Sequence, residues 1–250
     1  MKRTLSILFF LLPVICSHAK ERPPCFTHDC HPKTIRGCPD TGCAHPDTKG
    51  PNKGKLHPFD KELNKLKNKR SSNQPAALHS IQWIKDRRVP KSYVECGNRS
   101  VLKTQGESQK ITVLAWAVKA KPGHAESCNC DLPGVENYDT HIVLVDPHVN
   151  DPSFERDEIH SVTAEFTPRL RLNHPYFTTK DLSKKIREAD GKLLVRVTGL
   201  LMFDSKHAFE EQLARATDWE IHPVFKLEYC STRETCRANS NKNWKNLDKG

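Results

Sequence analysis

This chain has little long apolar sequence: one long apolar run occurs, and it lies within residues 1–19. A bilayer-spanning helix needs about 20 apolar residues, so no membrane span is expected in the rest of the chain. Compact catalytic motifs are also missing: there is no His-Glu-x-x-His, no Gly-x-Ser-x-Gly and no glycine-rich phosphate loop. Aromatic residues make up only 7% of the sequence. Few side chains are therefore offered for stacking on bases or sugars.

Residues 1–19 are typical of a secretory signal peptide. Lys2 and Arg3 form the positive start, an apolar stretch follows, and small residues precede a cleavage site after Ala19. A lipid anchor on Cys16 is the less favoured alternative, because a bulky residue stands before it. We therefore expect an exported product, periplasmic or secreted, whose signal peptide is cleaved after Ala19.

The mature chain then retains nine cysteines, which pair readily outside the cytoplasm. Nine is odd, so at least one stays free, pairs between chains or binds something. Cys230 and Cys236 are close enough in sequence to close a short loop. Cys128 and Cys130, one residue apart, are expected to pair with distant partners. The disulfide candidates are Cys25, Cys30, Cys38, Cys43, Cys96, Cys128, Cys130, Cys230 and Cys236.

The formal net charge of +10 favours acidic partners such as nucleic acid, anionic envelope polymers or phospholipid head groups. The alternative is that the charge serves solubility alone. Charge is an argument about association and not about fold.

The composition changes near residue 100. Residues 20–100 are predicted to be a basic, Cys/His-rich extension that is partly disordered, because large apolar residues are few in its first part. Within it, the spacing Cys-x4-Cys-x7-Cys-x4-Cys is interleaved with His28, His31 and His45. Zinc sites prefer Cys-x2–4-Cys followed by a longer gap and a second close pair, so this spacing fits only loosely. In an oxidising compartment, disulfide loops are therefore favoured over a zinc site. Residues 237–250 are predicted to be a flexible tail.

A short helix is expected between residues 59 and 70, with Asp60 as its N-cap. Leu63 and Leu66 give this helix only a narrow apolar edge, and the rest of its surface is basic. A phosphate-binding arm and a solvated face are the two interpretations, of which the solvated face is favoured.

Residues 101–236 are predicted to form a mainly β domain. Strands are expected at residues 110–119, 138–146, 161–167, 192–204 and 219–230, and a helix at residues 178–189. Gly199 in the fourth strand predicts a bulge or a barrel bend, and Pro223 makes the fifth an edge strand or a bulged one. Five strands with a helix between the third and fourth resemble the OB-fold, a small β-barrel.

Four short motifs in this domain carry a second resemblance. They are Glu-Ser-Cys-Asn-Cys at residues 126–130, Asp-x-His at 139–141, Glu-x-Thr-Pro-Arg at 165–169 and Arg-x-Thr-x-Trp-Glu-Ile-His-Pro at 215–223. Together they resemble a family of exported bacterial proteins to which no activity is assigned. The resemblance therefore implies the identity of the domain and no mechanism.

Polar residues at the strand ends suggest a metal-assisted hydrolase. Glu220 and His222 share one face of their strand by the period-two rule, and distant strand ends meet at a barrel rim. Imidazoles with a carboxylate suit zinc or manganese. In this hypothesis Glu165 activates water and Arg169 stabilises charge on a phosphate. The predicted metal ligands are Asp139, His141, Asp204, His207 and His222. The plainer interpretation is that these residues form a structural hydrogen-bond network.

Binding of an anionic polymer such as nucleic acid, through the face of an OB-like barrel, is the function that the sequence favours most. The candidate ligand-binding residues are Trp116, Tyr138, Arg171, Tyr176 and Arg196. A metal-dependent phosphodiesterase is the first alternative, and a structural or protein-binding envelope protein is the second. A divalent metal ion is the only cofactor suggested, and the sequence leaves the oligomeric state open.

Overall fold

The computed structural model describes residues 25–44, 46, 51, 53–207, 214–230 and 236–249. The predicted signal peptide and His45 lie outside the described residues. Among the described residues, no helix has the length and apolar character that a membrane crossing requires.

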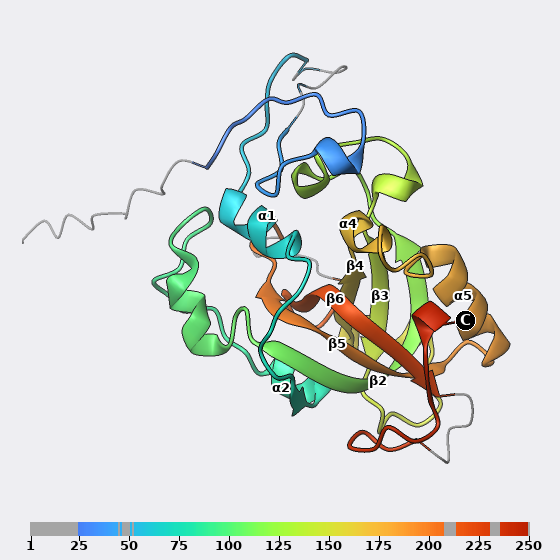
Figure 1. The fold of residues 1–250 in the computed structure, drawn as a ribbon. Helices are drawn as coiled ribbons and strands as arrows, with labels where there is room; N and C mark the ends of the chain where they lie inside the picture. Colours follow the sequence, from blue (N-terminus) through green and yellow to red (C-terminus); the bar gives the residue numbers. More distant parts are fainter. Residues whose placement is uncertain are drawn as a thin grey trace, which may run out of the picture.

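Five strands form a closed barrel (Figure 1). Strand β2 pairs antiparallel with β3 and with β5, β3 pairs antiparallel with β4, β4 runs parallel to β6, and β6 is antiparallel to β5. The predicted fold class, a mainly β barrel with few helices, is confirmed. The strands are β2 (Lys110–Pro122), β3 (Thr140–Val145), β4 (Val162–Phe166), β5 (Leu193–Phe203) and β6 (Trp219–Cys230).

The predicted helix between the third and fourth barrel strands is α5 (Thr179–Glu188). The side chain of Thr178 caps it by accepting a hydrogen bond from the backbone N–H of Asp181. Leu182 and Ile186 on its apolar face are buried in the barrel core. The helix therefore covers part of the barrel core, and it occurs at the predicted place between the third and fourth barrel strands.

Gly199 lies where the ladder between β5 and β6 changes register. A Cβ atom at this position would lie 2.5 Å from the carbonyl oxygen of Pro223 and 2.6 Å from the side chain of Ile221. The predicted bulge is therefore confirmed, and glycine is needed because the two backbones approach closely. Pro223 itself lies in a strand with neighbours on both sides, so of the two predicted alternatives β6 is bulged and not an edge strand.

Residues before 100 contribute regular structure to the barrel domain. Strand β1 (Ala77–His79) adds to β2 in parallel. Asp60 caps α1 (Lys61–Lys67) by accepting hydrogen bonds from the backbone N–H groups of Glu62 and Leu63.

At the C-terminal end of the described chain, β7 (Trp244–Asn246) pairs with β6 inside the predicted tail. The remaining helices are α2 (Ile81–Lys85), α3 (Phe154–Asp157), α4 (Pro168–Arg171), and the 3₁₀ segments η1 (Ile35–Gly37), η2 (Arg99–Gln105), η3 (Ser127–Asn129), η4 (Val135–Asn137), η5 (Glu158–His160) and η7 (Leu247–Lys249).

Disulfide bonds connect the N-terminal segment to itself and to the barrel. The short loop predicted for Cys230 and Cys236 is confirmed, and Cys130 has the distant partner that was expected. For Cys128 that expectation is wrong, because it is buried and forms no disulfide, which makes it the odd cysteine. The bonds are Cys25–Cys96, Cys30–Cys43, Cys38–Cys130 and Cys230–Cys236.

Candidate functional site

Acidic and imidazole side chains gather on the outer face of the barrel, opposite its apolar core, near the start of β3 and the ends of β4 and β5; we call this region the rim. The strand register explains this, because His141 of β3 lies opposite Glu165 of β4, and Glu220 of β6 lies opposite the end of β5. The parallel pairing of β4 with β6 brings the two halves together. Since Ala164 pairs with Ile221, His222 lies beside Glu165 on the neighbouring strand.

Three of these side chains, which we call the donor trio, are Asp139, Glu165 and His222. Their potential ligand atoms lie within 4.8 Å of one another, and the side chains are 0%, 2% and 0% exposed. His222 Nδ1 is 3.1 Å from Glu165 Oε2, and its Nε2 is 3.9 Å from Asp139 Oδ2. Among the described residues, Asp139 Oδ2 and His222 Nε2 have no hydrogen-bond partner. Two buried atoms of the type that binds metal ions thus lie 3.9 Å apart, and neither receives a hydrogen bond from the described residues.

Burial and charge act in opposite directions on the trio. Burial raises the pKa of Asp139 to about 6, although the neighbouring His222 opposes the shift. For His222 burial would lower the pKa, but the carboxylates of Glu165, Glu220 and Asp139 together raise it to about 10. Burial would likewise raise the pKa of Glu165, yet His141 and His222 hold it well below its usual range. His222 is therefore a cation at neutral pH when no metal ion is present.

Carboxyl groups outnumber cations in this buried region. Lys67, Arg215 and His222 are its buried positive groups, and Lys206 and the imidazoles of His141 and His207 adjoin it on the more exposed side. Arg215 donates to Glu220 Oε2 at 2.8 Å and lies 3.6 Å from Asp204 Oδ2. The buried carboxyl groups are Glu126, Asp139, Glu165, Asp204 and Glu220. Because buried charges are costly unless paired, the excess of acids favours an added cation.

Lys67 also belongs to this region, although the sequence analysis favoured a solvated face for the basic side of its helix. Its side chain is 3% exposed, and its Nζ donates to Glu126 Oε2 at 2.9 Å and lies 3.9 Å from Asp204 Oδ2. Burial would lower the pKa of Lys67, but Asp204 and Glu126 raise it well above its usual value. Lys67 follows Leu63 by four residues and so shares the apolar face of α1, which is the sequence signal that could have indicated its burial.

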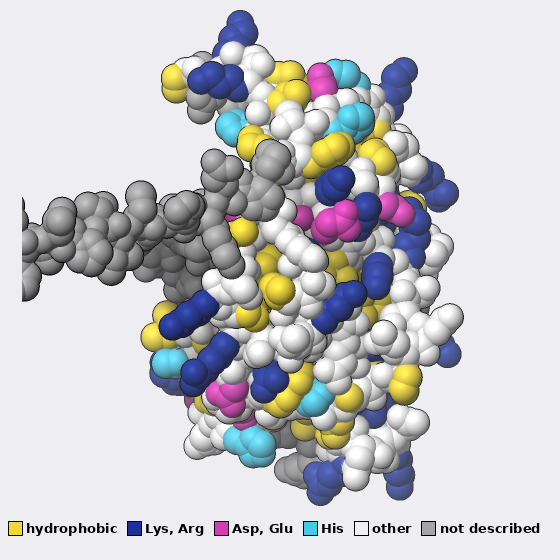
Figure 2. All heavy atoms as spheres, turned by 90° about the vertical axis from the view of Figure 1, so that its left-hand side faces the viewer, with side chains coloured by type: hydrophobic (Ala, Val, Ile, Leu, Met, Phe, Trp, Pro, Cys, Tyr) yellow, Lys and Arg dark blue, Asp and Glu magenta, His cyan; other side chains and the backbone are white. Residues whose placement is uncertain are grey.

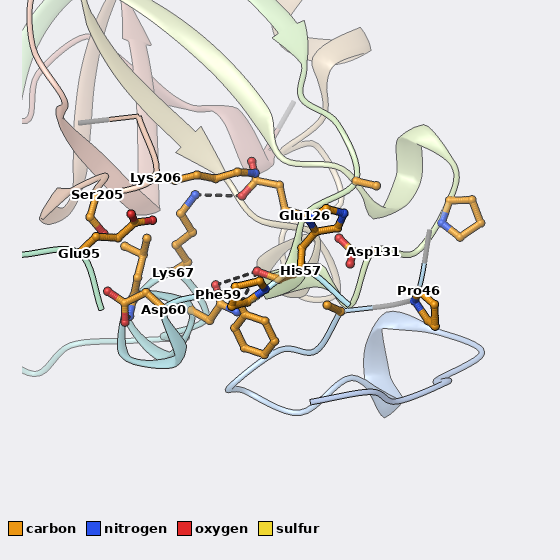
Figure 3. Close-up of a pocket in the computed structure, with 17 residues that line it drawn as sticks. Pro46, His57, Phe59, Asp60, Lys67, Glu95, Glu126, Asp131, Ser205 and Lys206 are labelled. Carbon is orange, nitrogen blue, oxygen red and sulfur yellow. Dashed lines mark hydrogen bonds and ion pairs between the residues drawn. The ribbon is translucent and has the colours of Figure 1, made fainter. Parts of the chain in front are cut away.

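A cavity of about 630 Å³ lies between α1 and the loop that carries Glu126 (Figure 3). Lys67 and Glu126 point toward each other across it, Phe59 lines its apolar side, and Lys206 and Glu95 lie at its edge. Glu126 also lines a second cavity at the rim. The Lys67–Glu126 pair thus lies on the boundary of both spaces.

The second cavity, which we call the rim cleft, has a volume of about 240 Å³. His141 Nε2 is 3.4 Å from Glu165 Oε1, and His207 Nε2 is 3.7 Å from Asp204 Oδ2, so a buried carboxylate stands behind each imidazole. Glu165 belongs to both the donor trio and the cleft wall. The charged and imidazole side chains that line the cleft are Lys121, Glu126, His141, Glu158, Glu165, Asp204, His207 and Arg215.

The predicted metal ligands are therefore collected at one rim but fall into two groups. Asp139 and His222 belong to the donor trio, with Glu165 as the third member instead of the predicted base. His141, Asp204 and His207 line the rim cleft beside the trio. Cys128 is a further neighbour, which the sequence analysis did not name as a metal ligand. Its Sγ lies 3.5 Å from Glu126 Oε2, and Cys128, Glu126 and Asp139 form a second group of possible ligands.

Arg169, predicted to stabilise charge on a phosphate, lies elsewhere. Its guanidinium is 2% exposed and donates to the carbonyl oxygens of Cys38 and Pro39, each at 2.8 Å. Its Nε donates to Asn68 Oδ1 at 2.7 Å. These bonds fasten the N-terminal loops to the barrel, and Arg169 does not line the rim cleft.

The five predicted ligand-binding residues differ in how exposed their side chains are and in whether other residues already bind them. Trp116 is buried in an apolar cluster, Arg171 donates to the carbonyl oxygens of Glu136 and Tyr138, and Arg196 pairs with Glu228 at 2.7 Å. Tyr138 is partly buried and Tyr176 is exposed. On the face in Figure 2, Lys and Arg side chains are spread among apolar and acidic ones and form no single basic patch.

No family model matches this chain, and neither the curated proteins nor the solved structures contain a match. The functional argument therefore depends on the chemistry of the rim.

Proposed function

We propose that this protein is an exported, metal-dependent hydrolase that cleaves phosphodiesters, with its ion held by Asp139, Glu165 and His222. The observation that carries the proposal is the buried donor trio, in which Asp139 Oδ2 and His222 Nε2 face each other without hydrogen-bond partners among the described residues. Export is supported by the signal-like residues 1–19 and by the four disulfide bonds.

The donor set suits zinc or manganese, which accept imidazole and carboxylate ligands. Ligand atoms about 2.0–2.2 Å from a zinc ion are about 3.4 Å apart in a tetrahedral site and farther apart at wider angles. The 3.9 Å separation of His222 Nε2 from Asp139 Oδ2 needs only a small adjustment to fit. A divalent ion here would polarise a phosphoryl oxygen and lower the pKa of a bound water.

Side chains of the rim cleft supply the other parts of the reaction. Arg215 and Lys121 line the cleft and offer positive charge to a phosphate that enters it. His141 and His207 are placed for proton transfer. In the reaction, the oxygen of water bonds to phosphorus, the bond from phosphorus to the leaving oxygen breaks, and the proton lost by water replaces phosphorus on that oxygen. The products are a phosphomonoester and an alcohol.

Hydrolysis of bis(p-nitrophenyl) phosphate by the mature protein tests this function. We expect release of p-nitrophenol that stops after treatment with a chelator and returns when zinc or manganese is added. Single-stranded DNA and RNA oligonucleotides in the same assay show whether a polymer is cleaved. The Glu228→Gln variant is a matched control, because Glu228 is a nearly buried carboxylate that pairs with Arg196 outside both the rim cleft and the donor trio. Activity that is insensitive to chelation, or no activity with any added ion, contradicts the proposal.

Binding of an anionic polymer without cleavage is a second candidate, favoured by the net charge of +10. It predicts affinity for a single-stranded oligonucleotide that weakens steeply as salt is raised. Retention of the intact oligonucleotide in the presence of zinc or manganese separates this candidate from the hydrolase.

A further inference from the structure

Two disulfide bonds lie against each other beside the barrel, and their sulfur atoms form one cluster. Cys30 Sγ is 3.8 Å from Cys130 Sγ, although each is bonded to a different partner. The sulfurs of Cys30, Cys43 and Cys130 all lie within 4.8 Å of one another, and Cys38 is bonded to Cys130. Three sulfurs from residues 30–43 and the sulfur of Cys130 therefore share one small volume, which is largely buried.

One distance in this cluster, between two sulfurs that are not bonded to each other, matches a tetrahedral thiolate site. Zinc binds cysteine sulfur at about 2.3 Å, so two sulfurs of a tetrahedral site are about 3.8 Å apart. The distance from Cys30 to Cys130 has this value already. When the two disulfides are reduced, side-chain rotation can separate the bonded sulfurs to a similar distance.

Hydrogen bonds hold the cysteine loops together independently of the disulfides. Arg169 donates to the carbonyl oxygen of Cys38, and Asn68 donates to that of Cys128 at 2.9 Å. The backbone N–H of Cys43 donates to the carbonyl oxygen of Ser127 at 3.0 Å. Arg169 and Asn68 are themselves joined and buried. The loops thus have a framework that keeps the four sulfurs close after reduction.

We propose that the reduced form of this cluster binds one zinc ion through Cys30, Cys38, Cys43 and Cys130. Each disulfide takes up two electrons and two protons from a dithiol, which is oxidised to its own disulfide. The four thiols then release four protons as they bind zinc as thiolates. The site is distinct from the donor trio. It keeps the N-terminal loops attached to the loop of Glu126 and Cys128 whether the cysteines are oxidised or reduced.

The test uses the full mature chain carrying Asp139→Asn, which disables the donor trio. The protein is reduced under native conditions with a phosphine, which reduces disulfides without the competing thiols of a dithiol. One equivalent of zinc is added or withheld, and the thiols are alkylated with iodoacetamide and mapped by mass spectrometry. We expect zinc to slow alkylation of the four cluster cysteines by at least about tenfold.

Cys230 and Cys236 form a short disulfide remote in sequence from the cluster, and their alkylation should be unchanged by zinc. Elemental analysis should give one zinc ion per reduced chain, and none for a Cys30→Ser, Cys43→Ser variant. Zinc that protects no cysteine, or that protects Cys230 and Cys236 equally, overturns the proposal. Loss of the fold on reduction, with no zinc retained, overturns it as well. None of these results depends on phosphodiester hydrolysis.

Discussion

Replacement of Glu165 by Gln is expected to lower kcat/KM for phosphodiester hydrolysis by more than about 100-fold, because the change removes a ligand charge while keeping the shape of the side chain. Glu165 is the member of the donor trio that also lines the rim cleft and contacts both His141 and His222. The loss should appear in steady-state kinetics at saturating zinc or manganese.

Two controls make this result specific. Circular dichroism and thermal unfolding of the Glu165→Gln variant show whether the barrel is intact, since a buried carboxylate is being neutralised. The Glu228→Gln variant changes a carboxylate that is 10% exposed, pairs with Arg196 at 2.7 Å and belongs to neither the rim cleft nor the trio. Equal activity losses in the two variants, or full activity of Glu165→Gln, would exclude the assigned role of Glu165.

Affinity for the divalent ion is expected to rise steeply with pH. In the ion-free protein the pKa of His222 is about 10, and a metal ion binds only the neutral imidazole. Between the pKa of Asp139, about 6, and that of His222, each ion bound therefore displaces one proton. The association constant should grow by about tenfold per pH unit, or about 30-fold from pH 7 to pH 8.5.

Electron paramagnetic resonance of free Mn²⁺ measures this dependence directly, because only unbound manganese gives the sharp aqueous signal. The measurement also reports the proton balance, since binding in weakly buffered solution should release about one proton per ion near pH 8. An affinity that is unchanged between pH 7 and pH 8.5 would show that His222 is not a ligand. An affinity that falls with rising pH would contradict the account equally.

Local pattern in the sequence was enough to place the barrel. The fifth strand was predicted at residues 219–230 and is β6 over the same residues, and the helix expected at 178–189 is α5 at Thr179–Glu188. Alternating side chains, the glycine within the fourth strand and the Asp60 N-cap are local signals, so they can be recognised without the tertiary structure. The shared face of Glu220 and His222 followed from the same period of two.

Long-range contacts set the limits of that prediction. Lys67 approaches the rim only because α1 packs against the end of β5, where Leu200 and Met202 cover its apolar edge. Arg169 was assigned to a phosphate because its partners, the carbonyl oxygens of a loop about 130 residues earlier, are invisible in a local pattern. The disulfide between Cys38 and Cys130 is equally invisible in a local pattern, because its cysteines have a sequence separation of 92.

Metal content of the purified mature protein tests the central claim most directly. The protein is kept oxidised, equilibrated with zinc or manganese, desalted and measured by elemental analysis beside its Asp139→Asn variant. The account predicts about one ion per wild-type chain and a clear loss in the variant, whose side chain keeps the shape of Asp139 but not its charge. A wild-type protein that retains no ion, or a variant that retains as much as the wild type, would contradict the proposed metal centre.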